Sequence, residues 1–272
     1  MSKTIEIITI ATGSYVQFIP FFLKNMPSFF SDCKKHIIIY TDADLSKNEG
    51  LKIFLENEIN KGMYTVELKK IHQLLYATLL LNKPVFVKEA INESYDYAFY
   101  FDIDTLFKND VDDTVYDTIR KKMDEGYMIL TKHPIYAMEE DEYFNGVPKA
   151  NAGNFLWNLE APVGKKCHID NFDSENYCIA SFYGGKTEIM KKFVQRLIDM
   201  ENGDLQRKEG YFVPRFIDEN YLNKIVNEYQ NGDLSILLDI GSYNELYGLK
   251  NKKIRSIFMY QKNFPIVKKE RL

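Results

Sequence analysis

The chain has 272 residues, 45% of them hydrophobic, which is enough for a folded domain and too apolar for a disordered segment. Its formal net charge of -4 argues against nucleic acid as a partner, because proteins that neutralise phosphate backbones usually carry a basic face. Three cysteines without disulfide or zinc spacing, and the lack of any apolar stretch long enough to span a membrane, favour a cytoplasmic protein with at most peripheral membrane contact.

Apolar strand-like segments alternate with amphipathic helix-like segments over the first hundred residues. The expected strands are residues 5–11, 36–42, 63–68 and 97–104, and the expected helices between them are residues 15–27, 51–55 and 73–90. This alternation predicts an α/β fold, a Rossmann-like domain with a mixed, mostly parallel sheet. In such a sheet ligand sites form at the carboxyl ends of the strands.

The strand around which the chain is organised ends in Asp102-Ile103-Asp104. Because side chains alternate faces along a strand, the two carboxylates are expected to point the same way, with Ile103 turned into the protein. Mn²⁺ and Mg²⁺ prefer oxygen ligands and are typically held by one or two carboxylates plus the phosphates of a substrate. The motif therefore predicts a metal ion that bridges the protein to a diphosphate.

The second half of the chain continues with the same kinds of segment. We expect a helix at 111–123, strands at 127–134 and 178–184, a tight turn at Gly184-Gly185, and helices at 189–198 and from Asp218 onward. No repeat or linker interrupts the chain, so residues 1–272 are expected to form one domain. Its parts would be a nucleotide-binding half at 1–110, a donor-sugar and acceptor half at 111–250, and a basic C-terminal lid at 251–272.

Asp218-Glu219 is a second pair of acidic residues that could take part in chemistry. A glycosyl transfer requires a carboxylate near the anomeric carbon, as a nucleophile, as a stabiliser of positive charge or as a base. The alternative is structural, because acidic residues are favoured at the start of a helix, where they face the positive end of the helix dipole.

Three further features have both a functional and a structural interpretation. The basic tail, with Lys262 and Lys268, could close over a diphosphate leaving group or could form an ordinary solvated surface. Gly184-Gly185 could permit a close approach of the backbone to a sugar or phosphate, or could only serve a turn. His133 could bind substrate at a strand end or could have a structural role.

Five segments, in order, resemble glycosyltransferase family 6, which contains the blood-group A and B transferases, the α1,3-galactosyltransferase and bacterial relatives. They are Ile10-Ala-Thr-Gly-Ser-Tyr15-Val, His36-Ile-Ile-Ile-Tyr-Thr-Asp42, Asp102-Ile103-Asp104, Tyr183-Gly184-Gly185 and Ile217-Asp218-Glu219-Asn220-Tyr221-Leu222-Asn223-Lys224. The resemblance implies a GT-A fold and retaining transfer of galactose or N-acetylgalactosamine from UDP-galactose or UDP-N-acetylgalactosamine. The implied acceptor is the 3-hydroxyl of a galactose-containing glycan.

The resemblance also implies roles for individual residues. For the nucleotide and metal these are Ala11, Thr12 and Tyr15 at the uridine, Asp102 and Asp104 at Mn²⁺ and the diphosphate, and Lys262 at the diphosphate. For the sugars they are Asp218 at the donor, Glu219 as nucleophile or stabilising base, His133 at the acceptor, and Ile179 and Ser181 as the pair that selects the donor.

The chain departs from the family pattern at three positions. The family's tryptophan and histidine before Asp-Glu are Phe216 and Ile217, and its arginine in the segment around residue 80 is replaced by Leu81. These changes affect positions that would touch the donor or the acceptor. They keep two other hypotheses open: a different sugar-nucleotide transferase or nucleotidyltransferase, and a protein that binds sugar nucleotides or glycans without catalysis.

Overall fold

The structure is a computed structural model that describes residues 2–72, 74, 76–107, 113–132, 143–144, 147–148, 161–170, 177–205, 217–229, 236–239 and 258–260. Its strands are β1 (Thr4–Ala11), β2 (Lys34–Thr41), β3 (Thr65–Lys70), β4 (Tyr97–Phe101), β5 (Thr105–Phe107), β6 (Met128–Lys132), β7 (Tyr143–Phe144), β8 (Val147–Pro148), β9 (Cys178–Lys186), β10 (Ile236–Asp239) and β11 (Phe258–Tyr260). Its α-helices are α1 (Ile19–Asn25), α2 (Glu49–Asn60), α3 (Tyr76–Ala90), α4 (Asp113–Asp124), α5 (Thr187–Leu205) and α6 (Ile217–Tyr229), and short 3₁₀ helices lie at Gly13–Phe18 and Met26–Ser28.

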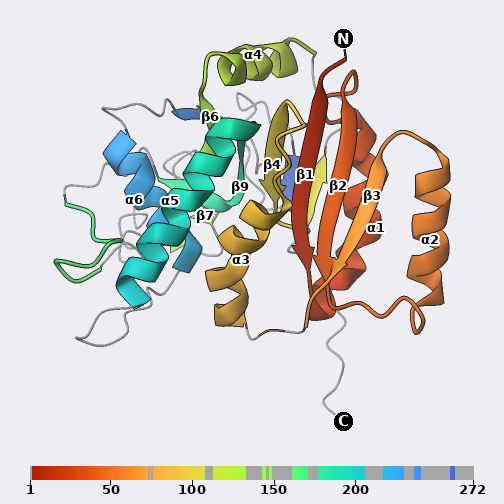
Figure 1. Cartoon of the computed structure of the whole chain (residues 1–272), viewed down its shortest axis with the longest axis horizontal. Coiled ribbons are helices and arrows are strands. Elements are labelled where there is room, and N and C mark those ends of the chain that lie inside the picture. Colours follow the sequence, from red (N-terminus) through yellow and green to blue (C-terminus); the bar gives the residue numbers. More distant parts are fainter. Residues whose placement is uncertain are drawn as a thin grey trace.

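A seven-stranded sheet forms the centre of the molecule, in the order β10-β6-β9-β4-β1-β2-β3 (Figure 1). All neighbouring pairs are parallel except those of β9, which runs antiparallel to both β4 and β6. The predicted α/β fold with a mixed, mostly parallel sheet is therefore confirmed.

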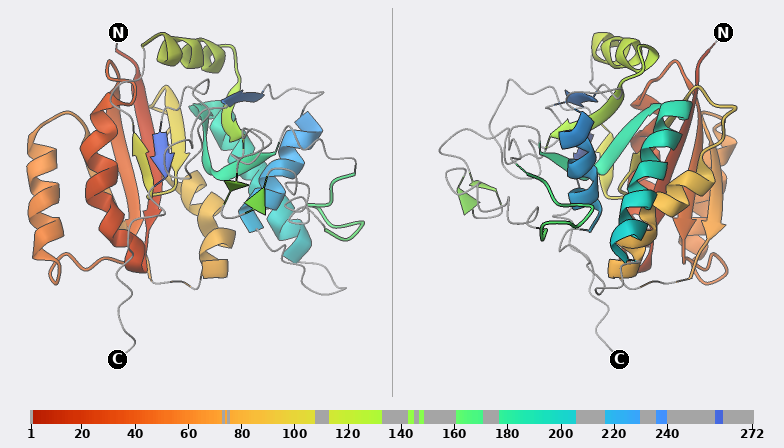
Figure 2. Two further views of the ribbon diagram at one scale, coloured as in Figure 1. Left: turned by 180° about the vertical axis from the view of Figure 1, so that it is seen from behind. Right: turned by 60° about the vertical axis from the view of Figure 1, so that its left-hand side comes forward.

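Helices cover both faces of this sheet, which explains why its central strands are apolar along their whole length (Figure 2). Side chains of α1, α2 and α4 pack in one core cluster with one face of the strands, and side chains of α3, α5 and α6 pack in a second cluster on the other face. All five residues of β4 are buried, and they alternate between the two clusters. This packing fixes the end of β4 in place.

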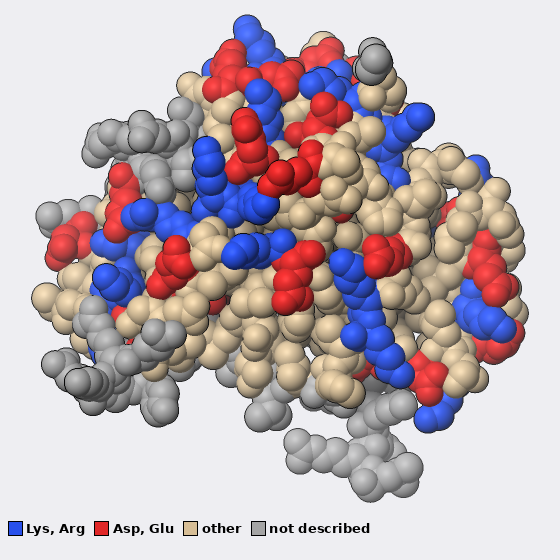
Figure 3. All heavy atoms as spheres, in the orientation of Figure 1, with Lys and Arg blue, Asp and Glu red and all other residues tan. Residues whose placement is uncertain are grey.

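Basic and acidic side chains are interspersed over the surface that α3 and α5 cover (Figure 3). The side chains shown on this face therefore do not form a surface of one sign. None of the helices in the described part of the chain is long and apolar enough to cross a membrane.

The structure corrects the expected turn at Gly184-Gly185. Gly184 and Gly185 lie inside β9 and not in a turn. Their role is in packing between strands: a Cβ atom at Gly184 would lie 2.0 Å from Cδ1 of Phe99, and one at Gly185 would lie 3.1 Å from the sulfur of Met128. Gly184 is paired with Phe99 in the register of the sheet, so the missing side chain makes room for the phenyl ring.

Candidate functional site

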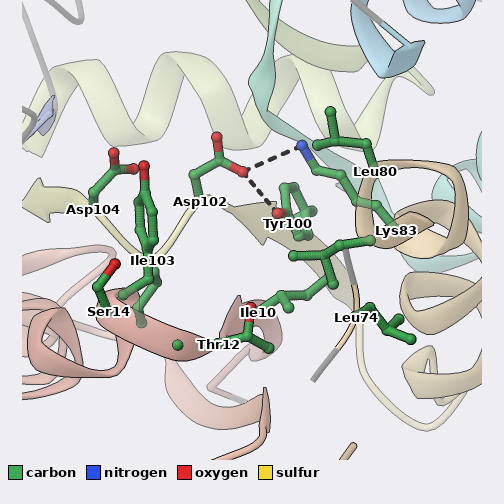
Figure 4. Close-up of a pocket in the computed structure, with 13 residues that line it drawn as sticks. Ile10, Thr12, Ser14, Leu74, Leu80, Lys83, Tyr100, Asp102, Ile103 and Asp104 are labelled. Carbon is green, nitrogen blue, oxygen red and sulfur yellow. Dashed lines mark hydrogen bonds and ion pairs between the residues drawn. The ribbon is translucent and has the colours of Figure 1, made fainter. Parts of the chain in front are cut away.

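A cavity of about 310 Å³ opens where β1 and β4 end. The residues that line it come from the ends of these two strands, from the 3₁₀ helix after β1, from the turn after β4, and from α3 and the segment before it (Figure 4). They are Ile10, Thr12, Gly13, Ser14, Tyr15, Leu74, Leu79, Leu80, Lys83, Tyr100, Asp102, Ile103 and Asp104. The cavity therefore combines one apolar wall with a group of charged and hydroxyl-bearing side chains, at the edge of the sheet where α/β folds bind ligands.

Asp102 and Asp104 both line this cavity, but the expected reason for it is wrong. Strand β4 ends at Phe101, and the N–H of Thr105 donates to the carbonyl of Asp102 at 3.1 Å, which closes a tight turn over the motif. The turn is anchored to β9, because the N–H of Asp102 donates to the carbonyl of Ser181 at 2.8 Å. A turn and not strand alternation thus brings both carboxylates to the cavity.

Lys83 is the centre of the charged group. Its Nζ lies 3.2 Å from Oδ1 of Asp102 and 2.6 Å from Oδ2 of Asp218, a residue 135 positions later in the chain. It also donates to the carbonyl of Ala180 at 2.9 Å and lies 4.6 Å from the centre of the Tyr100 ring. One buried ammonium group therefore joins the carboxylate of the turn to the carboxylate at the start of α6.

The protonation states around Lys83 follow from burial and from these contacts. Burial lowers the pKa of Lys83, but the carboxylates of Asp102 and Asp218 outweigh it and hold that pKa well above its usual value. Burial raises the pKa of Glu201 well above its usual value, and the charge of Asp218 adds to that effect. One ammonium group thus faces the two carboxylates of Asp102 and Asp218, a balance that favours a further cation.

Two tyrosines hold the carboxylates of the site in position. The hydroxyl of Tyr100 donates to Oδ1 of Asp102 at 2.7 Å, and the hydroxyl of Tyr177 donates to Oε2 of Glu219 at 2.7 Å. The ring of Tyr100 is in turn stacked on Tyr183, with 5.1 Å between ring centroids. Packed aromatic rings restrict the motion of both hydroxyl groups, which pre-organises the acidic side chains that they contact.

Helix α6 is bound to β9 through Asn223. Its side-chain amide accepts from the N–H of Cys178 at 2.7 Å and donates to the carbonyl of Cys178 at 2.8 Å, so it replaces a neighbouring strand. It also donates to the carbonyl of Glu219 at 2.8 Å. This fixes the first turn of α6, which carries Asp218 and Glu219.

The segment after β1 forms the opposite wall. Gly13 has a φ of 57°, a conformation that favours glycine, and its N–H donates to both carboxylate oxygens of Asp42, at 3.0 and 3.1 Å. This contact joins the two predicted segments that end β1 and β2. Of the three residues predicted to hold the uridine, Thr12 and Tyr15 line the cavity, whereas the neighbouring Ala11 is fully buried in the core below it.

The remaining predicted residues divide into two groups. Ile179 and Ser181 are buried in β9, where Ser181 touches the aspartate turn through its carbonyl, and neither they nor the two glycines line the cavity. His133, Phe216, Lys262 and Lys268 lie outside the described residues, so their predicted roles stay predictions.

Sequence reasoning did not identify Lys83, Tyr100 or Tyr177. A signal for Lys83 was present: it lies four residues after Leu79 in the helical segment, so it falls on the apolar side of α3, where an unpaired lysine would be costly. Nothing local marks the tyrosines, because their partners are set by the turn after β4 and by the packing of α6.

The donor atoms of the site fit a hard divalent cation held partly by a substrate. In the described part of the chain no group of three or more histidine, cysteine or acidic side chains is placed to hold a metal ion. Asp102 and Asp104 would therefore be the ligands from these residues, and phosphate oxygens and water would complete the coordination, as is usual for Mg²⁺ and Mn²⁺ with nucleotides.

No protein-family model matches the chain, and no curated protein matches it either.

Proposed function

We propose that this protein is a retaining glycosyltransferase with a GT-A fold that transfers galactose or N-acetylgalactosamine from a UDP-sugar. The acceptor would be the 3-hydroxyl of a galactose-containing glycan. The observation that supports this most is the link through Lys83 between Asp102 and Asp218. Through Lys83, the carboxylate of Asp102, which is suited to a metal–diphosphate group, lies near that of Asp218, which is suited to a sugar. The two aspartates are far apart in the chain.

The order of chemical groups around the cavity fits a sugar nucleotide. Thr12 and Tyr15 form a wall suited to a base and ribose, and Asp102 and Asp104 would hold the diphosphate through Mn²⁺, or Mg²⁺ in its place. Asp218 is not among the lining residues but contacts Lys83, which is one of them. The metal, when bound, would neutralise the charge that develops on the leaving UDP.

Lys83 could replace the arginine that the family pattern has and this chain lacks. The arginine expected near the donor is Leu81 in this chain, but a cation reaches the carboxylates two positions later. A lysine is a point charge with three donors and lacks the planar fork of an arginine. We expect this difference to alter the choice of donor more than the presence of activity.

Glu219 would act on the anomeric carbon. It is in the first turn of α6, next to Asp218, and its carboxylate is held by the hydroxyl of Tyr177 at 2.7 Å. This hydrogen bond holds the carboxylate in one orientation. In this role Glu219 would stabilise positive charge at the anomeric carbon, or attack it, while the UDP departs.

A panel of UDP-hexoses with Mn²⁺, tested with and without galactosyl acceptors, distinguishes this function from its alternatives. We expect release of free UDP, with the highest rate for UDP-galactose or UDP-N-acetylgalactosamine, and loss of the activity in excess chelator. Pyrophosphate as product would instead indicate a nucleotidyltransferase. Binding of UDP-sugars without any release of UDP would indicate a protein without transferase activity and would contradict the proposal.

A further inference from the structure

Strand β3 is the outer strand of the sheet on the side of β1 and β2, two strands away from β1. It pairs with β2 on one side, and no described strand pairs with its other side. Helix α2 lies beyond this edge in the views of Figures 1 and 2, and a cavity of about 410 Å³ separates it from β3. Leu55 and Ile59 of α2 and Val66 and Leu68 of β3 line this groove, and Ile59 is 44% exposed.

The backbone of β3 leaves a defined set of hydrogen-bonding groups at this edge. The N–H of Ile71 donates to the carbonyl of Thr41 on β2, at 2.9 Å. Because N–H and C=O groups alternate sides along a strand, the odd-numbered residues of β3 face β2. The N–H and C=O groups of Val66, Leu68 and Lys70 therefore face outward, where an added strand would meet them.

The charges of β3 favour a second copy of the same strand. Val66 and Leu68 pack toward the α1 and α2 side, so Glu67 and Lys69 project from the other face of the sheet. In an antiparallel pair centred on Leu68, Glu67 of each copy lies opposite Lys69 of the other. A pair centred on Glu67 or on Lys69 would instead place like charges opposite each other, which is unfavourable.

The same register satisfies the backbone. An antiparallel pair centred on Leu68 makes the two Leu68 residues a hydrogen-bonded pair, and Val66 of each copy forms another with Lys70 of the partner copy. Glu67 and Lys69 then form non-hydrogen-bonded pairs, in which Cα atoms are only about 4.5 Å apart and side chains are closest. The arrangement centred on Leu68 thus satisfies both hydrogen bonding and charge.

We propose that two copies of this chain associate through β3 to form one continuous sheet across a twofold axis. The Val66 and Leu68 side chains of each copy would enter the groove under α2 of the other copy, which covers apolar surface on Leu55 and Ile59. An unpaired strand edge is a ready template for such pairing. The interface is remote from the cavity at β1 and β4, so this inference does not depend on the proposed activity.

Sedimentation velocity of the purified full chain over a range of concentrations tests the proposal. We expect a dimer in equilibrium with a monomer. Glu67→Lys alone, or Lys69→Glu alone, creates two like-charge pairs by symmetry and should weaken dimerisation by about tenfold or more. The double variant Glu67→Lys/Lys69→Glu restores opposite charges across the axis and should return the dissociation constant to within about threefold of the original.

Two further variants separate this interface from other effects. Val66→Pro removes an N–H that faces outward and leaves the pairing with β2 intact, so it should yield a monomer with a normal circular dichroism spectrum. Glu125→Lys reverses an equally charged residue just after α4, paired there with Lys122, and should not change the dimer. A monomeric wild-type protein overturns the proposal, and so does a dimer whose affinity the charge reversals leave unchanged or the double variant fails to recover.

Discussion

Replacing Lys83 by methionine tests the central link of the site. Methionine keeps most of the volume of the buried side chain but removes the charge, so the carboxylates of Asp102 and Asp218 face each other without a cation. Removing one partner of a buried ion pair typically costs about 3–5 kcal/mol. Asp218 is 17% exposed and Asp102 is 33% exposed, so water compensates part of the loss. We expect the free energy of unfolding to fall by about 3 kcal/mol.

Urea unfolding followed by circular dichroism measures this loss, with Lys88→Met as the matched control. Lys88 is also on α3, but its ammonium group contacts the neutral side chain of Gln195, so its replacement should cost less than about 1 kcal/mol. In the double variant Lys83→Met/Asp218→Asn one of the stranded charges is removed as well. The double variant should be more stable than Lys83→Met alone, because the two sites are coupled.

A loss of unfolding free energy in Lys83→Met no larger than that in the Lys88→Met control would show that the Lys83 ion pairs do not stabilise the fold. A further loss of stability on adding Asp218→Asn to Lys83→Met would lead to the same conclusion. Binding of UDP, measured on the same proteins by calorimetry, shows whether the change also reaches the nucleotide. We expect weaker binding of UDP-sugar in Lys83→Met than in Lys88→Met.

Three further predictions concern single side chains. Burial raises the pKa of Glu6, which is 1% exposed, to about 7, so its proton is kept in the folded chain and lost near pH 4.5 in the unfolded one. The free energy of unfolding should therefore fall by about 3 kcal/mol from pH 4.5 to pH 7. Glu6→Gln should remove this decline in urea titrations at both pH values. Gly184→Ala should destabilise the fold by at least about 2 kcal/mol in the same assay, because the new methyl group would overlap Phe99; an unchanged midpoint would contradict the packing role. Tyr177→Phe should lower turnover about tenfold with little change in stability, because Glu219 loses the hydroxyl that orients it; equal rates would show that this contact is not used.

The elements that could be predicted are those whose signal is local. The apolar runs of β1 and β4 are buried on both faces, so each reads as a strand without knowledge of its neighbours. The first turn of α6 was also expected, from Asp218 and Glu219 before a helical stripe of apolar residues. The position of Asp102 at the end of β4 follows from the same pattern, and it lies at the cavity as predicted.

The parts that could not be predicted depend on long-range pairing. The N–H of Asp102 is held by the carbonyl of Ser181 on another strand, while its carbonyl accepts from Thr105 and begins the turn. The role of Gly184 is set by the register that places Phe99 opposite it. Lys83 meets Asp218 only because α3 and α6 pack on the same face of the sheet. None of these pairings leaves a periodic or local pattern in the sequence.

Transfer by Glu219→Gln, compared with that of the wild type, tests the central claim most directly. UDP release from UDP-galactose and UDP-N-acetylgalactosamine is measured with Mn²⁺ and a galactosyl acceptor, and UDP affinity is measured on the same samples. We expect the rate of transfer to fall by about two or more orders of magnitude while UDP affinity stays nearly unchanged, because glutamine keeps the size of the side chain and lacks its charge. A Glu219→Gln protein that releases UDP as fast as the wild type would contradict the account.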